Sequence, residues 1–148
     1  MSVAIRRATP AHLDALAGLF DGYRQFYRRP SDFDAARAFL GERLAADDSV
    51  LLVAERDGTL VGFTQLYPLF SSVRMRRVWV LNDLFVAPDA RRQGVARALM
   101  EGARAVAAST GAVALQLATE HDNRSAQALY EALGYERDTD FATYELAL

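Results

Sequence analysis

Cysteine and lysine are absent from this sequence of 148 residues, and histidine occurs only twice. Without cysteine the chain has no disulfide bond, no thiolate metal site and no cysteine nucleophile, and with two histidines we expect no metal site. Without lysine it cannot carry the phosphate-binding loop of nucleoside triphosphatases, which needs a lysine before a serine or threonine.

Long apolar runs and a large net charge are also missing. No stretch reaches the roughly 18 apolar residues that a membrane span requires, and no apolar run follows a basic start. We therefore expect a cytoplasmic protein that does not contact a membrane. The formal net charge of −2 argues against broad attraction to nucleic acid, although a local cluster of arginines can still hold one anionic ligand.

Hydrophobic residues make up 51% of the chain, which is enough for one compact domain, residues 1–148, with a buried core. Strand patterns and helix patterns alternate along it. We expect strands at 3–7, 50–55, 60–67, 78–87, 112–118 and 141–146. We expect helices from Thr9-Pro10 to about Arg28 and at 32–46, 95–109 and 123–133, with an irregular polar segment at 68–77.

The order of these elements predicts the fold class. Asp57-Gly58 is a strong hairpin signal between two strands. The helix at 95–109 connects two strands that are apolar on both faces, which is typical of a parallel crossover. The sequence thus predicts an α/β fold with a mixed, mostly antiparallel central sheet flanked by helices.

The segment 81–100 is the most informative part of the chain, because it predicts an anion site. An apolar strand leads through a turn at Pro88 and Asp89 into a loop broken by Gly94, and a helix follows. The first N–H groups of a helix have no intrahelical partner, and the helix dipole attracts a phosphate to that end. Gly94 lets the backbone come close. Three guanidinium groups add positive charge and paired donors around the same point: Arg91, Arg92 and Arg97.

The loop does not fit a dinucleotide-binding fingerprint, which requires three glycines after a first strand. Its pattern Arg91-x-x-Gly94-x-Ala96 resembles the Arg/Gln-x-x-Gly-x-Gly/Ala loop of the GNAT superfamily of acetyl-CoA-dependent N-acetyltransferases. A second motif, Asn123-x-x-Ala126-x-x-Leu129-Tyr130-x-x-x-Gly134-Tyr135, resembles the Asn-x-x-Ala-x-x-Leu-Tyr-x-x-x-Gly-Phe pattern of the same superfamily. The order of elements is similar to the GNAT fold over essentially the whole chain, and the pattern is closest to that of small-amine acetyltransferases.

The resemblance implies where acetyl-CoA would bind. Its pantetheine arm would pair with the backbone of Leu84, Phe85 and Val86, where a backbone amide could also stabilise the oxyanion, a contribution of about 3 kcal/mol. The pyrophosphate would lie on the loop formed by Arg91, Arg92, Gln93, Gly94, Val95, Ala96 and Arg97. Asn123 and Ala126 would complete the cofactor contacts. The residues alone allow plainer interpretations, in which Leu84 and Val86 also pack in the core and at least one arginine lies on the surface.

The resemblance also implies that Tyr130 gives a proton to the departing thiolate of the cofactor. Its spacing with Ala126, Leu129 and Leu133 would by itself favour a core residue. The matches of Asn123 and of Gly134-Tyr135 to the second motif reverse that preference.

The general base is less well defined by the sequence. Some GNAT relatives that acetylate polyamines or related small amines carry Glu-Asp before the cofactor strand, where this chain has Asn82-Asp83. The amide of Asn82 cannot accept a proton, although it could orient an amine. Asp83 is the nearest carboxylate and faces the other side of the strand. Glu120, His121 and a chain of water molecules are alternatives.

These observations predict an N-acetyltransferase that moves the acetyl group of acetyl-CoA to a primary amine of a small molecule, by direct attack in a ternary complex. We expect the amine to bind between the first two helices and the segment after strand 60–67. Aromatic residues there could hold its apolar part or its cation: Tyr23, Phe26, Tyr27, Tyr67, Phe70 and Trp79. The alternatives are a protein or peptide N-acetyltransferase and a non-catalytic acyl-CoA sensor, and Tyr130 favours an enzyme over a sensor. The resemblance and the abundance of aromatic residues predict a homodimer.

Overall fold

The computed structural model describes residues 2–148, which form two compact units. The first unit extends to Leu117 and the second is Ala118–Leu148. None of the helices in residues 2–148 combines the length and the apolar character that crossing a bilayer demands.

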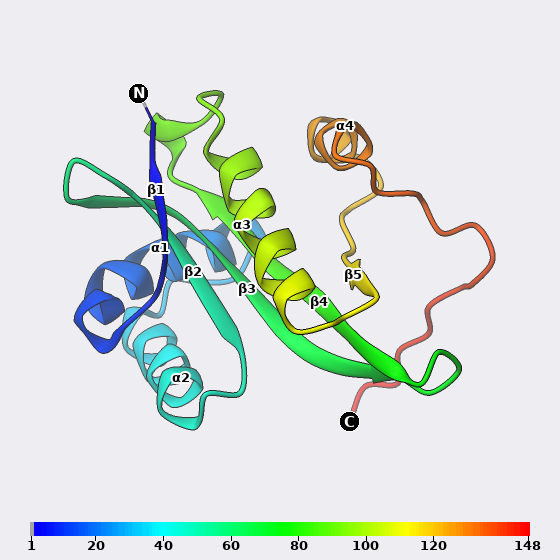
Figure 1. Ribbon diagram of the computed structural model, residues 1–148. Coiled ribbons are helices and arrows are strands. Elements are labelled where there is room, and N and C mark those ends of the chain that lie inside the picture. Colours follow the sequence, from blue (N-terminus) through cyan, green and yellow to red (C-terminus); the bar gives the residue numbers. More distant parts are fainter. Residues whose placement is uncertain (1) are drawn as a thin grey trace. The chain divides into compact units, whose positions relative to one another are not determined.

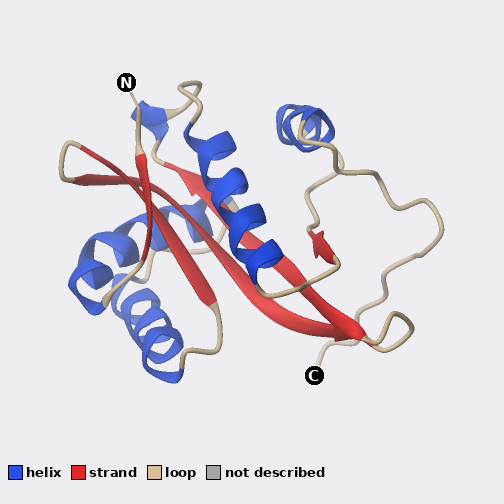
Figure 2. Cartoon of the chain, in the orientation of Figure 1, coloured by secondary structure: helices blue, strands red, loops and turns tan. Residues whose placement is uncertain are grey.

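A five-stranded sheet forms the centre of the first unit, with its strands in the order β1-β2-β3-β4-β5 (Figures 1 and 2). The strands are β1 (Ala4–Arg7), β2 (Val50–Arg56), β3 (Thr59–Ser71), β4 (Arg76–Val86) and β5 (Ala114–Gln116). The first three pairings are antiparallel, and β4 and β5 are parallel. The predicted α/β class with a mixed, mostly antiparallel sheet is confirmed.

Helices cover both faces of this sheet (Figure 1). They are α1 (Leu13–Phe26), which follows a 3₁₀ turn at Pro10–His12, α2 (Phe33–Ala46) and α3 (Val95–Ser109). Phe20 and Leu40 from α1 and α2 share a buried cluster with Phe63 and Phe85 of the sheet. On the other face, Val95 and Leu99 of α3 approach Gly62. The predicted helices at 9–28, 32–46 and 95–109 are therefore confirmed, apart from their ends.

The backbone of β3 and β4 approaches closely at Gly62, which predicts a costly substitution there. A Cβ on Gly62 would lie 2.9 Å from the carbonyl oxygen of Phe85, and a backbone atom cannot give way. We expect Gly62→Ala to lower the free energy of unfolding by about 1–3 kcal/mol through overpacking. A Cβ on Gly102 of α3 would also meet a neighbour at 2.9 Å, but this is the side chain of Ile5.

Gly102→Ala is the matched control, because the side chain of Ile5 can rotate away from the new Cβ. Alanine also favours the helix over glycine by roughly 1 kcal/mol. Urea unfolding of both variants gives the comparison. A Gly62→Ala protein as stable as the wild type would contradict this close packing.

The prediction that 68–77 is irregular was wrong, because β3 runs on to Ser71 and β4 already begins at Arg76. The pairing of β2 with β3 ends at Leu66, so Pro68 lies where β3 pairs with β4 alone. Across this hairpin the guanidinium carbon of Arg77 lies 4.6 Å from the ring centre of Phe70 and 5.4 Å from that of Trp79. Phe70 and Trp79 therefore contact Arg77.

Two predicted strands near the end of the chain differ from the structure. The strand expected at 112–118 is shortened to β5, and residues 141–146 form no strand. Phe141 and Tyr144 are 83% and 92% exposed. Apolar composition predicted a strand there, but a strand also requires a hydrogen-bonded neighbour for its backbone.

The second unit contains one helix among its described residues, α4 (Arg124–Ala132), and both of its ends are capped. Asn123 is the N-cap, as its position predicts, and its side-chain oxygen accepts from the N–H of Ala126 at 3.3 Å. At the other end Gly134 has φ +95°, and the N–H groups of Gly134 and Tyr135 donate to the carbonyls of Glu131 and Tyr130. This pair of bonds is a Schellman cap, so the second motif describes the two ends of a helix.

Candidate functional site

The edge of β4 is open along half of its length. The parallel pairing with β5 ends at Val80 and Gln116, whereas β4 continues to Val86 with β3 on its other side. Along the stretch that leads to the loop before α3, this edge of the strand therefore has no neighbouring strand of the first unit.

The direction of these groups follows from the pairing with β3. The N–H of Ala87 donates to Val61 of β3 at 2.8 Å, and the carbonyl oxygen of Phe85 lies toward Gly62 of the same strand. Backbone groups alternate between the two edges of a strand, so those of Leu84 and Val86 point to the open edge. Of the three residues predicted to meet pantetheine, Leu84 thus offers its N–H and carbonyl, and Val86 offers its N–H, since its carbonyl accepts from Arg91. Phe85 instead bonds to β3 and packs its ring 3.3 Å from a Cβ built on Gly22 of α1.

The loop after β4 ends in a helix N-terminus that suits an anion. Gly94 is the N-cap of α3 and has φ +82°, a left-handed conformation that favours glycine. The N–H of Ala98 donates to the carbonyl of Gly94 at 3.0 Å. The N–H groups of Val95, Ala96 and Arg97 precede that first helical bond and have no intrahelical acceptor. Apart from its neighbours in the chain, no atom lies within 4 Å of a Cβ built on Gly94, so the space beside it is open.

Side chains tie this loop to the sheet. Gln93 accepts from the guanidinium of Arg56 and donates to the carbonyl of Asp89 at 3.2 Å. Nε of Arg91 donates to the carbonyl of Val86 at 3.0 Å, and its guanidinium carbon lies 5.4 Å from the ring centre of Phe85. Arg91 and Gln93 therefore shape the loop.

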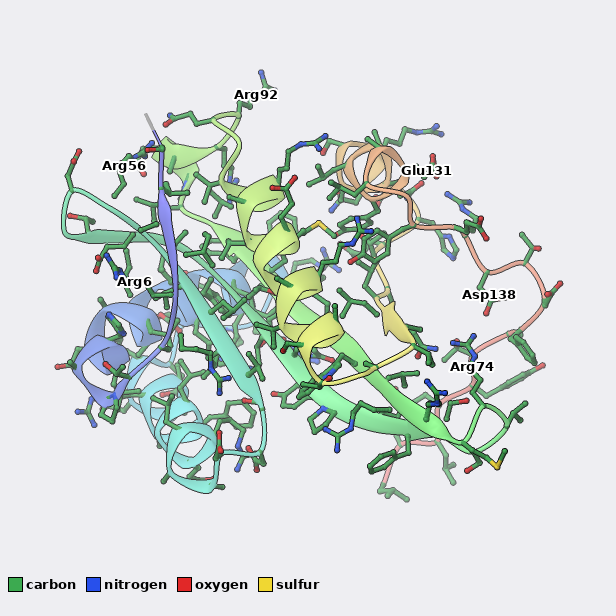
Figure 3. All side chains as sticks on the ribbon, in the orientation of Figure 1. Arg6, Arg56, Arg74, Arg92, Glu131 and Asp138 are labelled. Atoms are coloured by element: carbon green, nitrogen blue, oxygen red, sulfur yellow. The ribbon has the colours of Figure 1, made fainter. Side chains whose placement is uncertain are left out.

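Arg92 and Arg97 are exposed, and Figure 3 shows Arg92 extending away from the loop. Arg91 is exposed as well, but its guanidinium is engaged by the carbonyl of Val86 and the ring of Phe85. Arg92 and Arg97 are therefore the cationic side chains best placed to meet phosphate oxygens.

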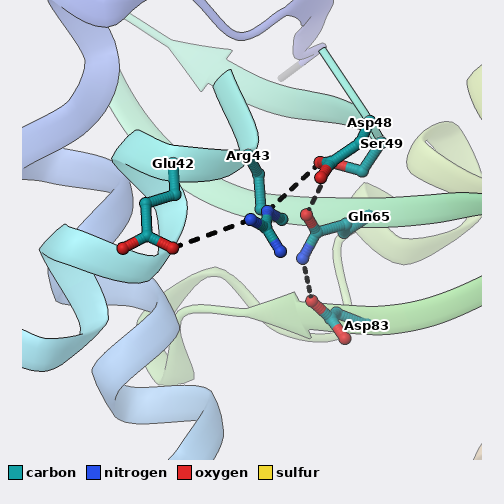
Figure 4. A network of polar contacts seen from close by, with 6 residues as sticks. All are labelled: Glu42, Arg43, Asp48, Ser49, Gln65 and Asp83. Atoms are coloured by element: carbon teal, nitrogen blue, oxygen red, sulfur yellow. Dashed lines mark hydrogen bonds and ion pairs between the residues drawn. The ribbon is translucent and has the colours of Figure 1, made fainter. Parts of the chain in front are cut away.

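A buried carboxylate lies on β4 just before the open edge. Asp83 is 3% exposed, and its two oxygens accept from Nε2 of Gln65 at 2.6 Å, from Nδ2 of Asn82 at 2.7 Å and from the hydroxyl of Tyr23 at 3.4 Å. Ser49 donates to Gln65 at 2.8 Å and so extends the network (Figure 4). Burial raises the pKa of Asp83 above its ordinary value, and the three hydrogen bonds oppose that shift.

A β-bulge explains how Asn82 reaches Asp83. The register shifts between Gln65 and Leu66, which pair with Asp83 and Leu81, so Asn82 has no partner on β3. Asn82 is exposed and Asp83 is buried, which agrees with the prediction that the two side chains face opposite sides of the strand. The bulge nevertheless lets the amide of Asn82 turn back onto the carboxylate.

Tyr23 of α1 lies at the centre of an aromatic cluster beside this carboxylate. Its ring centre is 5.3 Å from that of Tyr27, 5.8 Å from that of Phe63 and 6.3 Å from that of Phe85. Its hydroxyl also donates to the carbonyl of Asn82 at 3.1 Å. Tyr23 thus adjoins Asn82 and Asp83, and Tyr27 packs against the ring of Tyr23. Trp79 instead donates to Thr110 at the end of α3.

Sequence reasoning missed two members of this site, Gln65 and the hydroxyl of Tyr23. The signal for Gln65 was present, because an amide in an otherwise apolar strand must find buried partners. For Tyr23 the sequence showed only one aromatic residue among several.

The second unit carries the other predicted residues. The side chain of Asn123 caps α4, and Tyr130 is half-buried with its ring centre 6.1 Å from that of Tyr135. Gln127 donates to the backbone carbonyls of Glu120 and His121 and so holds the turn before the helix. The described residues contain no group of three histidine, aspartate or glutamate side chains that could hold a metal ion.

Comparison with known proteins identifies the family. The model of the Acetyltransferase (GNAT) family matches residues 15–135. The chain is 51% identical over 140 residues to the uncharacterized N-acetyltransferase YhfO of Bacillus subtilis (strain 168), covering 95% of this chain and 94% of YhfO. A crystal structure of a probable acetyltransferase is 45% identical and has a TM-score of 0.93, covering 98% of this chain and 97% of the other.

The aminoglycoside N-acetyltransferase AAC(6')-Iy, solved in complex with CoA, is 25% identical with a TM-score of 0.82, covering 99% of this chain and 95% of the other. Both motifs of the sequence fall within residues 15–135. The chain therefore belongs to the GNAT family and is an acetyltransferase that takes its acetyl group from acetyl-CoA.

Proposed function

We propose that this acetyltransferase moves the acetyl group of acetyl-CoA to a primary amine of a small molecule, by direct attack in a ternary complex. The observation that carries the proposal is the juxtaposition of Asn82 and Asp83, an exposed amide and a buried carboxylate, at the start of the open edge of β4. The amide can orient an amine, and the carboxylate can accept its proton. Direct attack is also favoured because the chain has no cysteine to carry an acyl group.

The cofactor would lie along the open edge and the following loop. The backbone of Leu84 and the N–H of Val86 would pair with pantetheine, and one of these N–H groups would face the oxyanion. The pyrophosphate would meet the N–H groups of Val95, Ala96 and Arg97 and the guanidinium groups of Arg92 and Arg97. Asn123 and Ala126 remain proposed cofactor contacts. Tyr130 is the proposed proton donor to the departing thiolate.

A small amine is favoured as acceptor by the groups around Asn82. The ring of Tyr27 can attract a cation, and its neighbour Tyr23 bonds to the negatively charged Asp83. The aminoglycoside N-acetyltransferase among the similar structures acts, by its name, on a small molecule with amino groups. An amine arrives largely as an ammonium ion, since an alkylamine has a pKa near 10.4, so it must lose a proton before it attacks.

The experiment is a panel of amines with the purified chain and acetyl-CoA, monitored for free thiol. We expect thiol release with small primary amines and little release with peptides that offer an N-terminus or a lysine. A peptide as the best acceptor would support the protein-acetyltransferase alternative. Binding of acetyl-CoA without turnover of any amine would support the sensor.

A further inference from the structure

The proposed general base cannot touch the acceptor directly. Asp83 is only 3% exposed, and both of its oxygens already accept hydrogen bonds. A proton from the amine must therefore reach Asp83 through one of the side chains that bond to it.

Only one of these side chains can carry a proton. Gln65 and Asn82 approach Asp83 through their amide NH₂ groups, which donate hydrogen bonds but do not pass protons on. Tyr23 approaches through a hydroxyl, which can accept one proton while it gives up another.

We propose that Tyr23 relays the proton of the acceptor amine to Asp83, an inference that rests on the proposed function. As the step proceeds, an N–H bond of the ammonium breaks and its proton bonds to the oxygen of Tyr23. The original O–H bond of Tyr23 breaks, and that proton bonds to Oδ1 of Asp83. The amine is left with the electron pair that attacks the thioester. Asp83 becomes a neutral acid, and after the acetylated product leaves it gives its proton through Tyr23 to solvent.

The position of the Tyr23 hydroxyl fits this task. It lies 3.1 Å from the carbonyl oxygen of Asn82 and 3.4 Å from Oδ1 of Asp83, so it can turn between an exposed residue and the buried carboxylate. The longer contact has room to tighten when a substrate binds. Edge contacts with Tyr27, Phe63 and Phe85 hold the ring in place.

The electrostatics also suit a relay. Burial and the charge of Asp83 raise the pKa of Tyr23, so its phenol stays neutral and keeps a proton to give. Burial and the same charge raise the pKa of Tyr67 on β3 to about 12. Arg43 and Asp48, which form an ion pair at 3.1 Å, also act on Tyr67. Asp83, whose pKa burial raises, is therefore the group of this cluster whose protonation changes as the pH falls.

The test is a double-mutant cycle with Tyr23→Phe, Asp83→Asn and the combined variant, using an acceptor from the amine panel. A relay predicts that each single variant loses about 10²-fold in kcat/KM, the lower end of general acid–base catalysis. The combined variant should lose no more than the worse single variant, because both changes cut the same path. The KM for acetyl-CoA should stay near that of the wild type.

The pH profile gives a second readout that packing alone would not move. In the wild type, kcat/KM should fall as the pH drops through the raised pKa of Asp83, because the protonated carboxyl cannot accept a proton. The residual activity of Tyr23→Phe should lack this fall. Tyr144→Phe makes the same change at a tyrosine that is 92% exposed, so it should retain both the rate and the fall.

Two results would overturn the relay: a folded Tyr23→Phe protein within about threefold of the wild-type rate, or losses that multiply to roughly 10⁴-fold in the combined variant. Failure of the proposed function looks different. In that case the wild type itself binds acetyl-CoA but acetylates no amine.

Discussion

Replacing Gly94 with glutamate is expected to abolish acetyl-CoA binding while the chain remains folded. The new carboxylate would lie at the N-terminus of α3, beside the N–H groups proposed to hold the pyrophosphate. Two unit charges about 4 Å apart repel by roughly 4 kcal/mol at an effective dielectric constant near 20. Since about 1.4 kcal/mol is tenfold in affinity, we expect the Kd measured by titration calorimetry to rise by more than about 100-fold.

Gly111→Glu provides the matched control for this substitution. Gly111 also has a left-handed backbone, φ +77°, and open space around it, but it follows the other end of α3. Both variants therefore gain a charge and a comparable backbone strain of about 1–2 kcal/mol. Equal loss of binding in the two would show that strain, and not the anion site, is responsible. A folded Gly94→Glu protein with wild-type affinity would remove the proposed site altogether.

Replacing Tyr130 with phenylalanine is expected to lower turnover by about 10²- to 10⁴-fold, with little change in acetyl-CoA affinity. The substitution keeps the ring, and with it most of the packing of α4, and deletes only the proposed proton donor. A thiolate that leaves without a proton is a poorer leaving group, so the loss should appear in kcat. The assay is steady-state release of free thiol with an acceptor from the panel.

Tyr135→Phe is the control in the same motif, because the superfamily pattern itself carries phenylalanine at that position. The two rings are neighbours in the second unit, so the control tests the packing of the pair without touching the proposed acid. If chemistry is rate-limiting and Tyr130→Phe turns over at the wild-type rate across the pH range, Tyr130 is a packing residue and not the acid.

Local chemistry explains which predictions from the sequence succeeded. The loop before α3 and the ends of α4 depend on residues close in sequence, since Gly94 supplies a left-handed N-cap and Asn123 and Gly134 supply caps. Such caps and turns form wherever these residues occur at the same spacing, so the family motifs contain them.

The predictions that failed concern partners distant in sequence. Residues 68–77 form a hairpin because β3 and β4 lie side by side, and 141–146 form no strand for want of a partner. The surroundings of Asp83 depend on a bulge at Asn82. In a regular strand the two side chains would point to opposite faces, but the bulge lets the amide of Asn82 bond to the carboxylate of Asp83. The approach of Tyr23, 60 residues away, leaves no periodic signal in the sequence.

The central claim is direct transfer from acetyl-CoA to a small amine, and a single-turnover experiment tests it most directly. Excess enzyme is mixed with acetyl-CoA, with and without the best amine of the panel, while free thiol and acetylated amine are followed in time. Direct transfer predicts no thiol without the amine, and with it one thiol per acetylated amine at the same rate constant. Thiol release before or without the amine would reveal an acyl-enzyme and contradict direct transfer, and the absence of release with every amine would contradict the enzymatic function proposed for this chain.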